Sequence, residues 1–300
     1  MFLTPREYLE RFGRKASKSL GQHFLIQPKT AQRIVDALDI SQNDIVVEIG
    51  PGLGALTRYL IEYPCRLHLV ELDARLAEAL KSLMPPSRAF VAWHIQDALD
   101  LSWERVIEDE KIRQIDKCPD RIKVVGNIPY NISSPLLFSL IASHKVIERA
   151  VLMVQREVGQ RWTAVPGTKD YGIPTVILGS CAKAEKMFSV GHGQFVPPPK
   201  VESLVVRLWF FDVPKWEPLN YDFFRQFVSE VFRQRRKTIF NGLKNFISRY
   251  GIGSTDLILS CLEEMGISSS ARPEELFPDV FVELAKRFAE KIEQSSFDSD

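Results

Sequence analysis

Short apolar runs alternate with segments of helical periodicity along the first half of the chain. Five runs predict buried β-strands, over residues 45–49, 67–71, 89–95, 122–126 and 150–154. Helical spacing of apolar residues predicts helices between them, over residues 30–38, 74–83 and 135–143, and through Leu56, Leu60 and Ile61. Strands that alternate with helices in this way predict a parallel sheet with right-handed crossovers, which is an α/β fold.

The pattern changes after residue 155. Two later strands are predicted over residues 175–181 and 201–209, with the turn Pro197-Pro198-Pro199 before the second. Residues 211–220 contain two prolines and have the composition of a linker, and from Tyr221 onward the periodicity is only helical. We therefore expect an α/β domain over residues 1–210, a linker over residues 211–220 and a small all-α domain over residues 221–300.

Composition describes a globular protein of 300 residues, 45% hydrophobic and 26% charged, with a sizeable core. The formal net charge of +1 predicts no general affinity for polyanions. Basic side chains are nevertheless concentrated in two places, because residues 1–33 and residues 223–250 carry seven each. Two local basic patches on a neutral chain indicate a directed polyanion-binding surface, although two solvated faces would give the same pattern.

Four widely spaced cysteines argue against both a zinc site and a disulfide framework, since no C-x-x-C pair occurs among Cys65, Cys118, Cys181 and Cys261. Free thiols fit a reducing compartment. The N-terminus lacks the apolar core of a secretory signal, and no apolar run is long enough to span a bilayer. We expect a cytoplasmic protein that uses neither a metal nor a membrane.

A glycine-rich loop, Glu48-x-Gly50-x-Gly52-x-Gly54, lies between a predicted strand and a predicted helix. Glycines there allow close approach of a ligand to the backbone, and Glu71, at the end of the next strand, could accept hydrogen bonds from ribose hydroxyls. The even spacing departs from the dinucleotide fingerprint G-x-G-x-x-G, which disfavours a nicotinamide-dependent oxidoreductase. A cofactor with ribose and adenine but no phosphates, S-adenosylmethionine, fits better. Asp97 ends the third strand and could bind the adenine amine or simply cap a helix.

Asn127-Ile128-Pro129-Tyr130 follows the strand over residues 122–126, at the sheet edge where open α/β proteins bind ligands. An amide carbonyl can accept a hydrogen bond from an exocyclic amine, and a tyrosine ring can stack on a flat base. Pro129 restrains the backbone and holds both groups in place. Taken alone, the four residues could also form an ordinary strand-to-helix turn.

Five motifs together carry a family resemblance that covers roughly residues 15–290. They are Lys18-Ser19-Leu20-Gly21-Gln22-His23-Phe24-Leu25, Glu48 to Gly54, Asn127 to Ser133, Phe195 to Ser203 and Gln234-Arg235-Arg236-Lys237-Thr238. In this order they resemble the ribosomal small-subunit RNA adenine N6,N6-dimethyltransferase family, also called the KsgA/Dim family.

The resemblance implies a Rossmann-like class I methyltransferase sheet with a small C-terminal helical domain. It also implies an enzyme that methylates two adjacent adenosines near the 3′ end of 16S rRNA, acting as a monomer on an immature small subunit during ribosome biogenesis. When the family's cofactor-binding positions are carried over one by one, the residues expected to bind S-adenosylmethionine are His23, Leu25, Gly50, Gly52, Glu71, Asp97 and Asn127. Members usually have Asn at position 23 and Leu at position 128. The resemblance therefore does not fix which contact the His23 side chain makes with the cofactor.

In this interpretation the Asn127 side chain and the Ile128 carbonyl accept hydrogen bonds from the adenine amine, while Pro129 holds the loop. Tyr130 stacks on one face of the base, and Phe195 on the other unless it is a core residue bracing the proline turn. The rRNA phosphates are bound by Arg14, Lys15, Lys18, Arg235, Arg236 and Lys237.

Two related functions compete with this interpretation. Large-subunit rRNA adenine methyltransferases of the antibiotic-resistance type share the catalytic motif, but they lack the Pro197 to Lys200 signature. A noncatalytic assembly factor could bind rRNA with the same fold, although the intact Glu71, Asp97 and Asn127 predict a working cofactor site.

Overall fold

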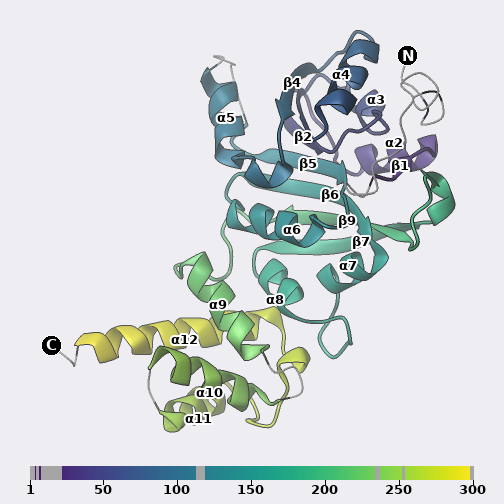
Figure 1. Cartoon of the computed structure of the whole chain (residues 1–300). Coiled ribbons are helices and arrows are strands. Elements are labelled where there is room, and N and C mark those ends of the chain that lie inside the picture. Colours follow the sequence, from purple (N-terminus) through teal and green to yellow (C-terminus); the bar gives the residue numbers. More distant parts are fainter. Residues whose placement is uncertain are drawn as a thin grey trace. The chain divides into compact units, whose positions relative to one another are not determined.

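The computed structural model describes Thr4, Glu7 and residues 22–112, 119–233, 237–251 and 254–297. The chain divides into two compact units. Unit 1 consists of Met1–Gln160 and Ala184–Asp212, and unit 2 of Arg161–Lys183 and Val213–Asp300. Figure 1 shows the sheet with its helices and the separate helical group.

Unit 1 is built on a sheet of seven strands in the order β4-β3-β2-β5-β6-β9-β7. In that order the strands are Phe90–Ile95, Arg66–Glu71, Ile45–Ile49, Ile122–Asn127, Ile147–Gln155, Ser203–Phe210 and Ala182–Val190. Neighbours from β4 to β6 are parallel, and β9 is antiparallel to β6. Every residue of β2 is buried, because helices cover both faces of the sheet. The α/β prediction is therefore confirmed.

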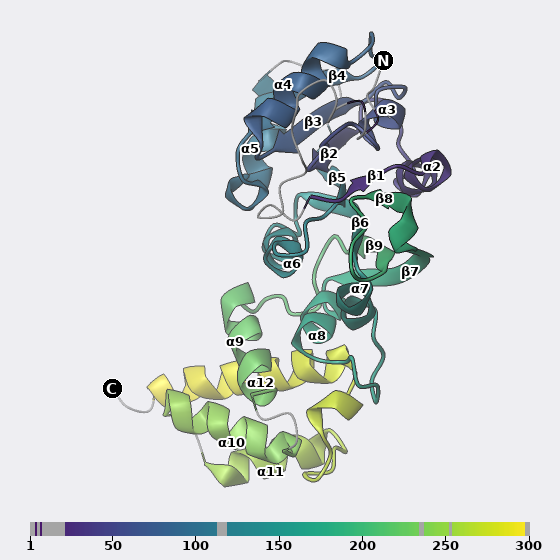
Figure 2. The same cartoon turned by 45° about the vertical axis from the view of Figure 1, so that its right-hand side comes forward.

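The helices of unit 1 follow the strands in the expected alternation. Figure 2 shows α5 and α6 on one side of the sheet and α2 and α3 on the other. The helical segments are α2 (Pro28–Asp36), α3 (Thr57–Leu60), α4 (Ala74–Leu83), η1 (Ala98–Asp100), α5 (Trp103–Ile112), α6 (Ser133–Ala142), α7 (Arg156–Trp162), of which the last two residues belong to unit 2, and η2 (His192–Gln194). A separate two-stranded ladder pairs β1 (Phe24–Leu25) with β8 (Phe195–Val196) in antiparallel register.

The strand predicted over residues 175–181 is wrong, because the structure has a helix there, α8 (Ile173–Gly179). A continuous apolar run fits a buried helix as well as a buried strand, so its composition could not separate the two. Pro174 in the first turn favours a helix start at this position. The strand follows instead as β7 (Ala182–Val190), which is buried at both ends and partly exposed between them.

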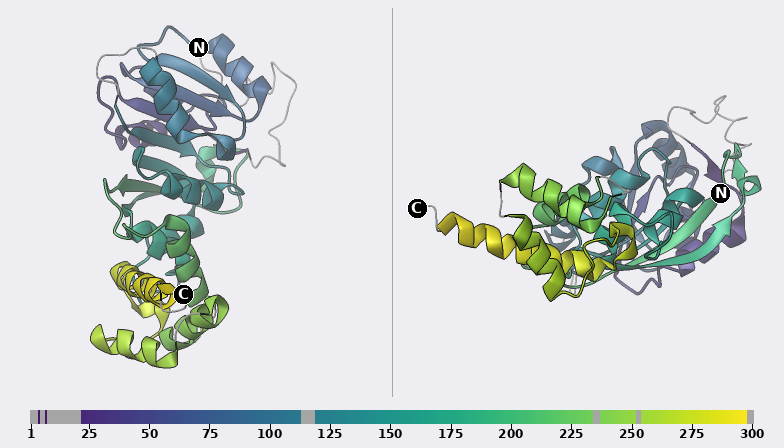
Figure 3. Two further views of the ribbon diagram at one scale, coloured as in Figure 1. Left: turned by 90° about the vertical axis from the view of Figure 1, so that its left-hand side faces the viewer. Right: turned by 90° about the horizontal axis from the view of Figure 1, so that it is seen from below.

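Unit 2 is helical and has an aromatic core. Its elements are α8, α9 (Tyr221–Val231), α10 (Ile239–Tyr250), α11 (Thr255–Glu264), η3 (Pro273–Glu275) and α12 (Pro278–Phe297), drawn mostly in green and yellow in Figure 3. The rings of Phe227 and Phe246 meet edge to face at 5.0 Å. Trp216 is 1% exposed and stacks on Phe224 at 5.5 Å, so part of the segment expected to be a linker packs into unit 2.

Unit 2 also includes Arg161–Lys183, which the sequence placed in the first domain. Hydrogen bonds tie this segment to later residues, since Lys215 N–H donates to the Ser180 carbonyl at 2.8 Å. The Tyr171 hydroxyl likewise donates to the Leu276 carbonyl at 2.7 Å. Among the residues described in both units, no helix has the length and apolar character needed to cross a membrane.

Candidate cofactor and target-base site

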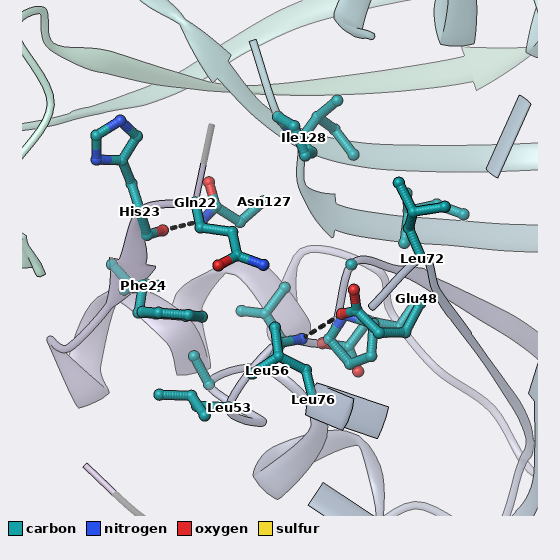
Figure 4. Close-up of a pocket in the computed structure, with 18 of the residues that line it drawn as sticks. Gln22, His23, Phe24, Glu48, Leu53, Leu56, Leu72, Leu76, Asn127 and Ile128 are labelled. Carbon is teal, nitrogen blue, oxygen red and sulfur yellow. Dashed lines mark hydrogen bonds between the residues drawn. The ribbon is translucent and has the colours of Figure 1, made fainter. Parts of the chain in front are cut away.

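A cavity of about 410 Å³ opens where β2, β3, β4 and β5 end. Parallel strands bring their carboxyl ends to one edge of the sheet, so residues far apart in sequence meet there. Of the cofactor and catalytic residues named from the sequence, all but Phe195 line this cavity, several of them labelled in Figure 4: His23, Leu25, Gly50, Gly52, Glu71, Asp97, Asn127, Ile128, Pro129 and Tyr130.

The glycine loop between β2 and α3 has a backbone that other residues rarely adopt. Gly50, Gly52 and Gly54 have φ angles of +64°, +53° and +78°, in the left-handed region. A Cβ atom at Gly52 would also lie 3.3 Å from the Phe24 ring. The loop therefore needs glycine, and it presents its backbone directly to the cavity.

Glu71 is oriented by this loop. Gly52 N–H donates to its Oε2 and Asp73 N–H to its Oε1, each at 3.0 Å. Burial raises the pKa of Glu71, while the two backbone donors act in the opposite direction. A carboxyl group held in this way at the end of β3 is well placed to accept hydrogen bonds from ribose hydroxyls, as the sequence suggested.

Glu48 is a second buried carboxyl in the cavity wall, and the sequence assigned it no role of its own. It is 1% exposed, and the Thr57 hydroxyl donates to its Oε2 at 2.7 Å. Burial, with a smaller contribution from the nearby Glu71, raises the pKa of Glu48 to about 8. At neutral pH this group is therefore mainly a protonated acid. The burial of Glu48 and its hydrogen bond with Thr57 are visible only in the fold, because Thr57 belongs to the following helix, α3.

The rest of the cofactor half is apolar or acidic. Leu53, Leu56 and Leu76 line it together with Phe24 (Figure 4), and Asp97 also lines the cavity. Asp97 caps η1 by accepting from Leu99 N–H at 2.9 Å, so both roles considered for it are compatible. Arg58 also lines the cavity, but its Nε donates to the Gly54 carbonyl at 3.3 Å. The carboxyl groups of Glu71 and Asp97 and the apolar wall suit a ligand that contains ribose and adenine.

Asn127 ends β5 with its amide in one defined orientation. Its Nδ2 donates to the His23 carbonyl oxygen at 2.8 Å, shown dashed in Figure 4. Because a carbonyl can only accept, this bond leaves Oδ1 as the acceptor end of the amide. Ile128 N–H donates to the Met153 carbonyl at 2.9 Å and fixes the start of the loop.

Tyr130 follows in the same loop with its ring partly buried. Ile132 N–H donates to the Pro129 carbonyl at 3.1 Å and closes the turn. The ring of Tyr130 stacks against that of His23, with centroids 5.6 Å apart and planes at 29°. Burial raises the pKa of the Tyr130 phenol, so the ring is neutral at physiological pH.

Phe195 is where the structure corrects the proposed base clamp. It is 2% exposed, lies in the hydrophobic core of unit 1 and does not line the cavity. Its pairing with Leu25 across the β1–β8 ladder accounts for its position. In this structure Phe195 braces the ladder, and its ring is not available to a base.

Of the basic residues expected to bind rRNA, the structure describes only Lys237. Arg14, Lys15, Lys18, Arg235 and Arg236 lie outside the described residues. Lys237 is exposed and precedes Thr238, the N-cap of α10. In the same unit Glu230, 6% exposed, forms ion pairs with Arg233 at 3.4 Å and with Arg249. The negative charge of Glu230 offsets part of the positive charge of these two arginines.

The fold matches solved methyltransferase structures over nearly its whole length. A dimethyladenosine transferase from Plasmodium falciparum aligns with a TM-score of 0.72 and 26% identity, covering 90% of this chain and 98% of that one. The 23S rRNA methyltransferase ErmE aligns with a TM-score of 0.63 and 24% identity, covering 89% of this chain and 99% of that one. The sheet, the glycine loop and the acidic cavity define a class I, S-adenosylmethionine-dependent methyltransferase.

Sequence comparison places the chain within this class. The family model described as "Ribosomal RNA adenine dimethylase" matches residues 13–269. A "Ribosomal RNA small subunit methyltransferase A" from Syntrophus aciditrophicus is 36% identical, covering 93% of this chain and 96% of the relative. One of the same description from Maridesulfovibrio salexigens is 38% identical, covering 91% and 95%. The chain belongs to the ribosomal RNA adenine dimethylase family, which confirms the resemblance drawn from the five motifs.

Proposed function

We propose that this protein methylates the 6-amino groups of two adjacent adenosines near the 3′ end of small-subunit rRNA, using S-adenosylmethionine. The observation that carries the proposal is the orientation of Asn127, whose amide is anchored to the His23 carbonyl at the edge of the cavity. The curated relatives are small-subunit enzymes, and this favours small-subunit rRNA over the large-subunit substrate in the name of ErmE.

The adenine 6-amino nitrogen is a poor nucleophile, because its lone pair is delocalised into the ring. When bound, the cofactor supplies an electrophilic methyl group. Asn127 Oδ1 and the Ile128 carbonyl accept hydrogen bonds from the two N–H groups of the amine, which favours a pyramidal nitrogen with an available lone pair. A strong general base is unnecessary, because the nitrogen becomes acidic once it has gained the methyl group. Positioning and electrostatics therefore provide most of the catalysis.

The cofactor half of the cavity is assigned by chemistry. Glu71 accepts hydrogen bonds from the ribose hydroxyls and Asp97 accepts one from the adenine amine. The backbone at Gly50 and Gly52 permits close contact with the cofactor. Leu25 contributes an apolar contact beside the glycine loop. The support for these roles is that all five residues line one cavity.

The target base is stacked on Tyr130 and the rRNA backbone is bound by basic side chains. Lys237, together with Arg14, Lys15, Lys18, Arg235 and Arg236, contacts phosphates, so binding weakens as salt rises. The substrate is an immature small subunit, and the protein works on it as a monomer in the cytoplasm.

The test uses labelled methyl transfer to purified small subunits that lack the modification. We expect label in the rRNA and dimethyladenosine as the product nucleoside by mass spectrometry. Asn127→Ala should abolish transfer while leaving the thermal unfolding midpoint near that of the wild type. Asn127→Asp should also be inactive, because a carboxylate cannot donate to the His23 carbonyl.

Each outcome separates one part of the proposal. Wild-type protein that transfers no label to small subunits would refute the substrate. Label on a nucleoside other than methylated adenosine would refute the target base. Full transfer by Asn127→Ala would remove Asn127 from the reaction while leaving the substrate assignment intact.

A further inference from the structure

The imidazole of His23 lies on the target-base side of the cavity. Figure 4 shows the ring pointing away from Phe24, Leu53 and Leu76, which belong to the cofactor half. Only the backbone carbonyl of His23 contacts Asn127, at 2.8 Å. The ring itself faces Tyr130, with centroids 5.6 Å apart and planes at 29°. The side chain is thus beside the ring on which the base is proposed to stack.

The β1–β8 ladder places His23 there. Phe24 is paired with Val196 and Leu25 with Phe195, so the antiparallel register brings residue 23 next to Pro197. His23 Nδ1 lies 2.8 Å from the Pro197 carbonyl oxygen, an atom that can only accept. Nδ1 therefore carries a proton and donates, which holds the imidazole at a defined angle over Tyr130.

We propose that His23 is the second stacking surface for the target adenine, so that the base is held between the imidazole and the Tyr130 ring. This inference rests on the proposed function and names a specificity residue for the same site. It replaces Phe195, whose ring is buried in the core. Two aromatic rings from different segments then sandwich one purine, as single-stranded bases are commonly held.

The two rings are already close to the required separation. Stacked bases lie about 3.4 Å apart, so a purine between two rings needs centroids about 6.8 Å apart. The centroids of His23 and Tyr130 are 5.6 Å apart and their planes are at 29°, so the rings would have to separate by at least about 1.2 Å and become more nearly parallel. To admit the base, the imidazole would have to move away from Tyr130 by that distance.

Three variants separate the ring from its hydrogen bond. His23→Asn keeps a donor for the Pro197 carbonyl but loses the aromatic ring, His23→Phe keeps a ring but loses the donor, and His23→Ala loses both. The matched control is His192→Ala, because His192 is an exposed histidine in η2 that does not line the cavity. Each full-length protein is assayed for kcat/KM with immature small subunits and for the dissociation constant of S-adenosylmethionine.

Loss of one base–aromatic stack lowers kcat/KM for the rRNA substrate by about 5- to 150-fold. We expect this fall for His23→Ala and His23→Asn, with cofactor affinity within about threefold of the wild type. His23→Phe should restore most of kcat/KM, and His192→Ala should match the wild type in both measurements. A 2-aminopurine placed at the target position should be quenched by the wild type and by His23→Phe, and less by His23→Asn.

The opposite results overturn the inference. If His23→Asn equals the wild type while His23→Phe fails, the imidazole serves only to brace the Pro197 turn. If cofactor affinity falls in parallel with kcat/KM in all three variants, His23 belongs to the cofactor half. A wild-type enzyme that methylates no adenine would instead refute the proposed function, so the two failures are distinguishable.

Discussion

Replacing Glu48 with glutamine should remove a large part of the pH dependence of stability between pH 5 and 8. Glu48 is 1% exposed, and its Oε2 accepts from the Thr57 hydroxyl at 2.7 Å. Glutamine has nearly the same shape and can accept that hydrogen bond through its own Oε1. The substitution therefore removes an ionisable group from the cavity wall and leaves its packing almost unchanged.

The direction and size of the effect follow from the raised pKa of Glu48. The carboxyl has an ordinary pKa of 4.5 and a pKa of about 8 in the folded protein, because burial disfavours the ionised form. Between these values the folded state retains a proton that the unfolded chain has released. The stabilising contribution of Glu48 is complete below pH 4.5 and is lost as the pH rises through 8. The slope approaches about 1.4 kcal/mol per pH unit, or about 4–5 kcal/mol in total.

Urea unfolding of both proteins at pH 5.5, 6.5, 7.5 and 8.5 measures this. The free energy of unfolding of Glu48→Gln minus that of the wild type should rise by about 1 kcal/mol per pH unit up to pH 8. The difference between the two curves is used, because the chain has two compact units that both contribute to unfolding. Glu62→Gln is the matched control, because Glu62 is an exposed carboxyl shortly after α3.

Parallel pH curves for the wild type and Glu48→Gln would refute the argument. They would mean that Glu48 ionises in the folded protein as easily as in the unfolded chain, so that burial does not control its charge. A pH-dependent difference of the same size in Glu62→Gln would show that the effect comes from surface charge in general.

Three further predictions test other parts of the molecule. Tyr130→Ala should lower kcat at least tenfold more than it lowers cofactor affinity, because base stacking contributes about 1–3 kcal/mol; normal turnover with lost cofactor binding would reverse the assignment. Gly126→Ala should destabilise the protein by about 1–3 kcal/mol, because its Cβ would lie 2.7 Å from the Ile49 carbonyl oxygen, and an unchanged melting temperature would contradict this. Lys237→Ala should weaken rRNA binding and lower the salt slope by about one without changing the methylated nucleoside; an unchanged slope would exclude a phosphate contact.

The strands near the site were predictable from the sequence because they are buried on both faces. Ile45–Ile49 contains almost only apolar residues, and the strand begins and ends where the pattern predicts. The same rule failed over residues 175–181, because a buried helix such as α8 has equally continuous apolar character. Local composition therefore identifies burial more reliably than it identifies the secondary structure that causes it.

The candidate site shows the same limit. Spacing after strand ends identified Glu71, Asp97 and Asn127, because the carboxyl ends of parallel strands meet at one edge. Phe195 stands in a recognisable motif, but whether its ring faces a cavity or the core depends on the register of the β1–β8 ladder. That register pairs segments about 170 residues apart, and no local pattern contains it.

The order of apolar and polar residues by itself determined the parallel α/β architecture. The glycine spacing identified the loop, and five short motifs carried the resemblance to the family, because each of these features lies in a short contiguous stretch of the sequence. The tertiary structure alone decided which groups share a surface. It buried the carboxyl of Glu48 beside Thr57, fixed the Asn127 amide through the His23 carbonyl, and set the imidazole against the Tyr130 ring. Charge state and ring stacking depend on distances of a few ångströms between distant segments, and such distances exist only after the chain has folded.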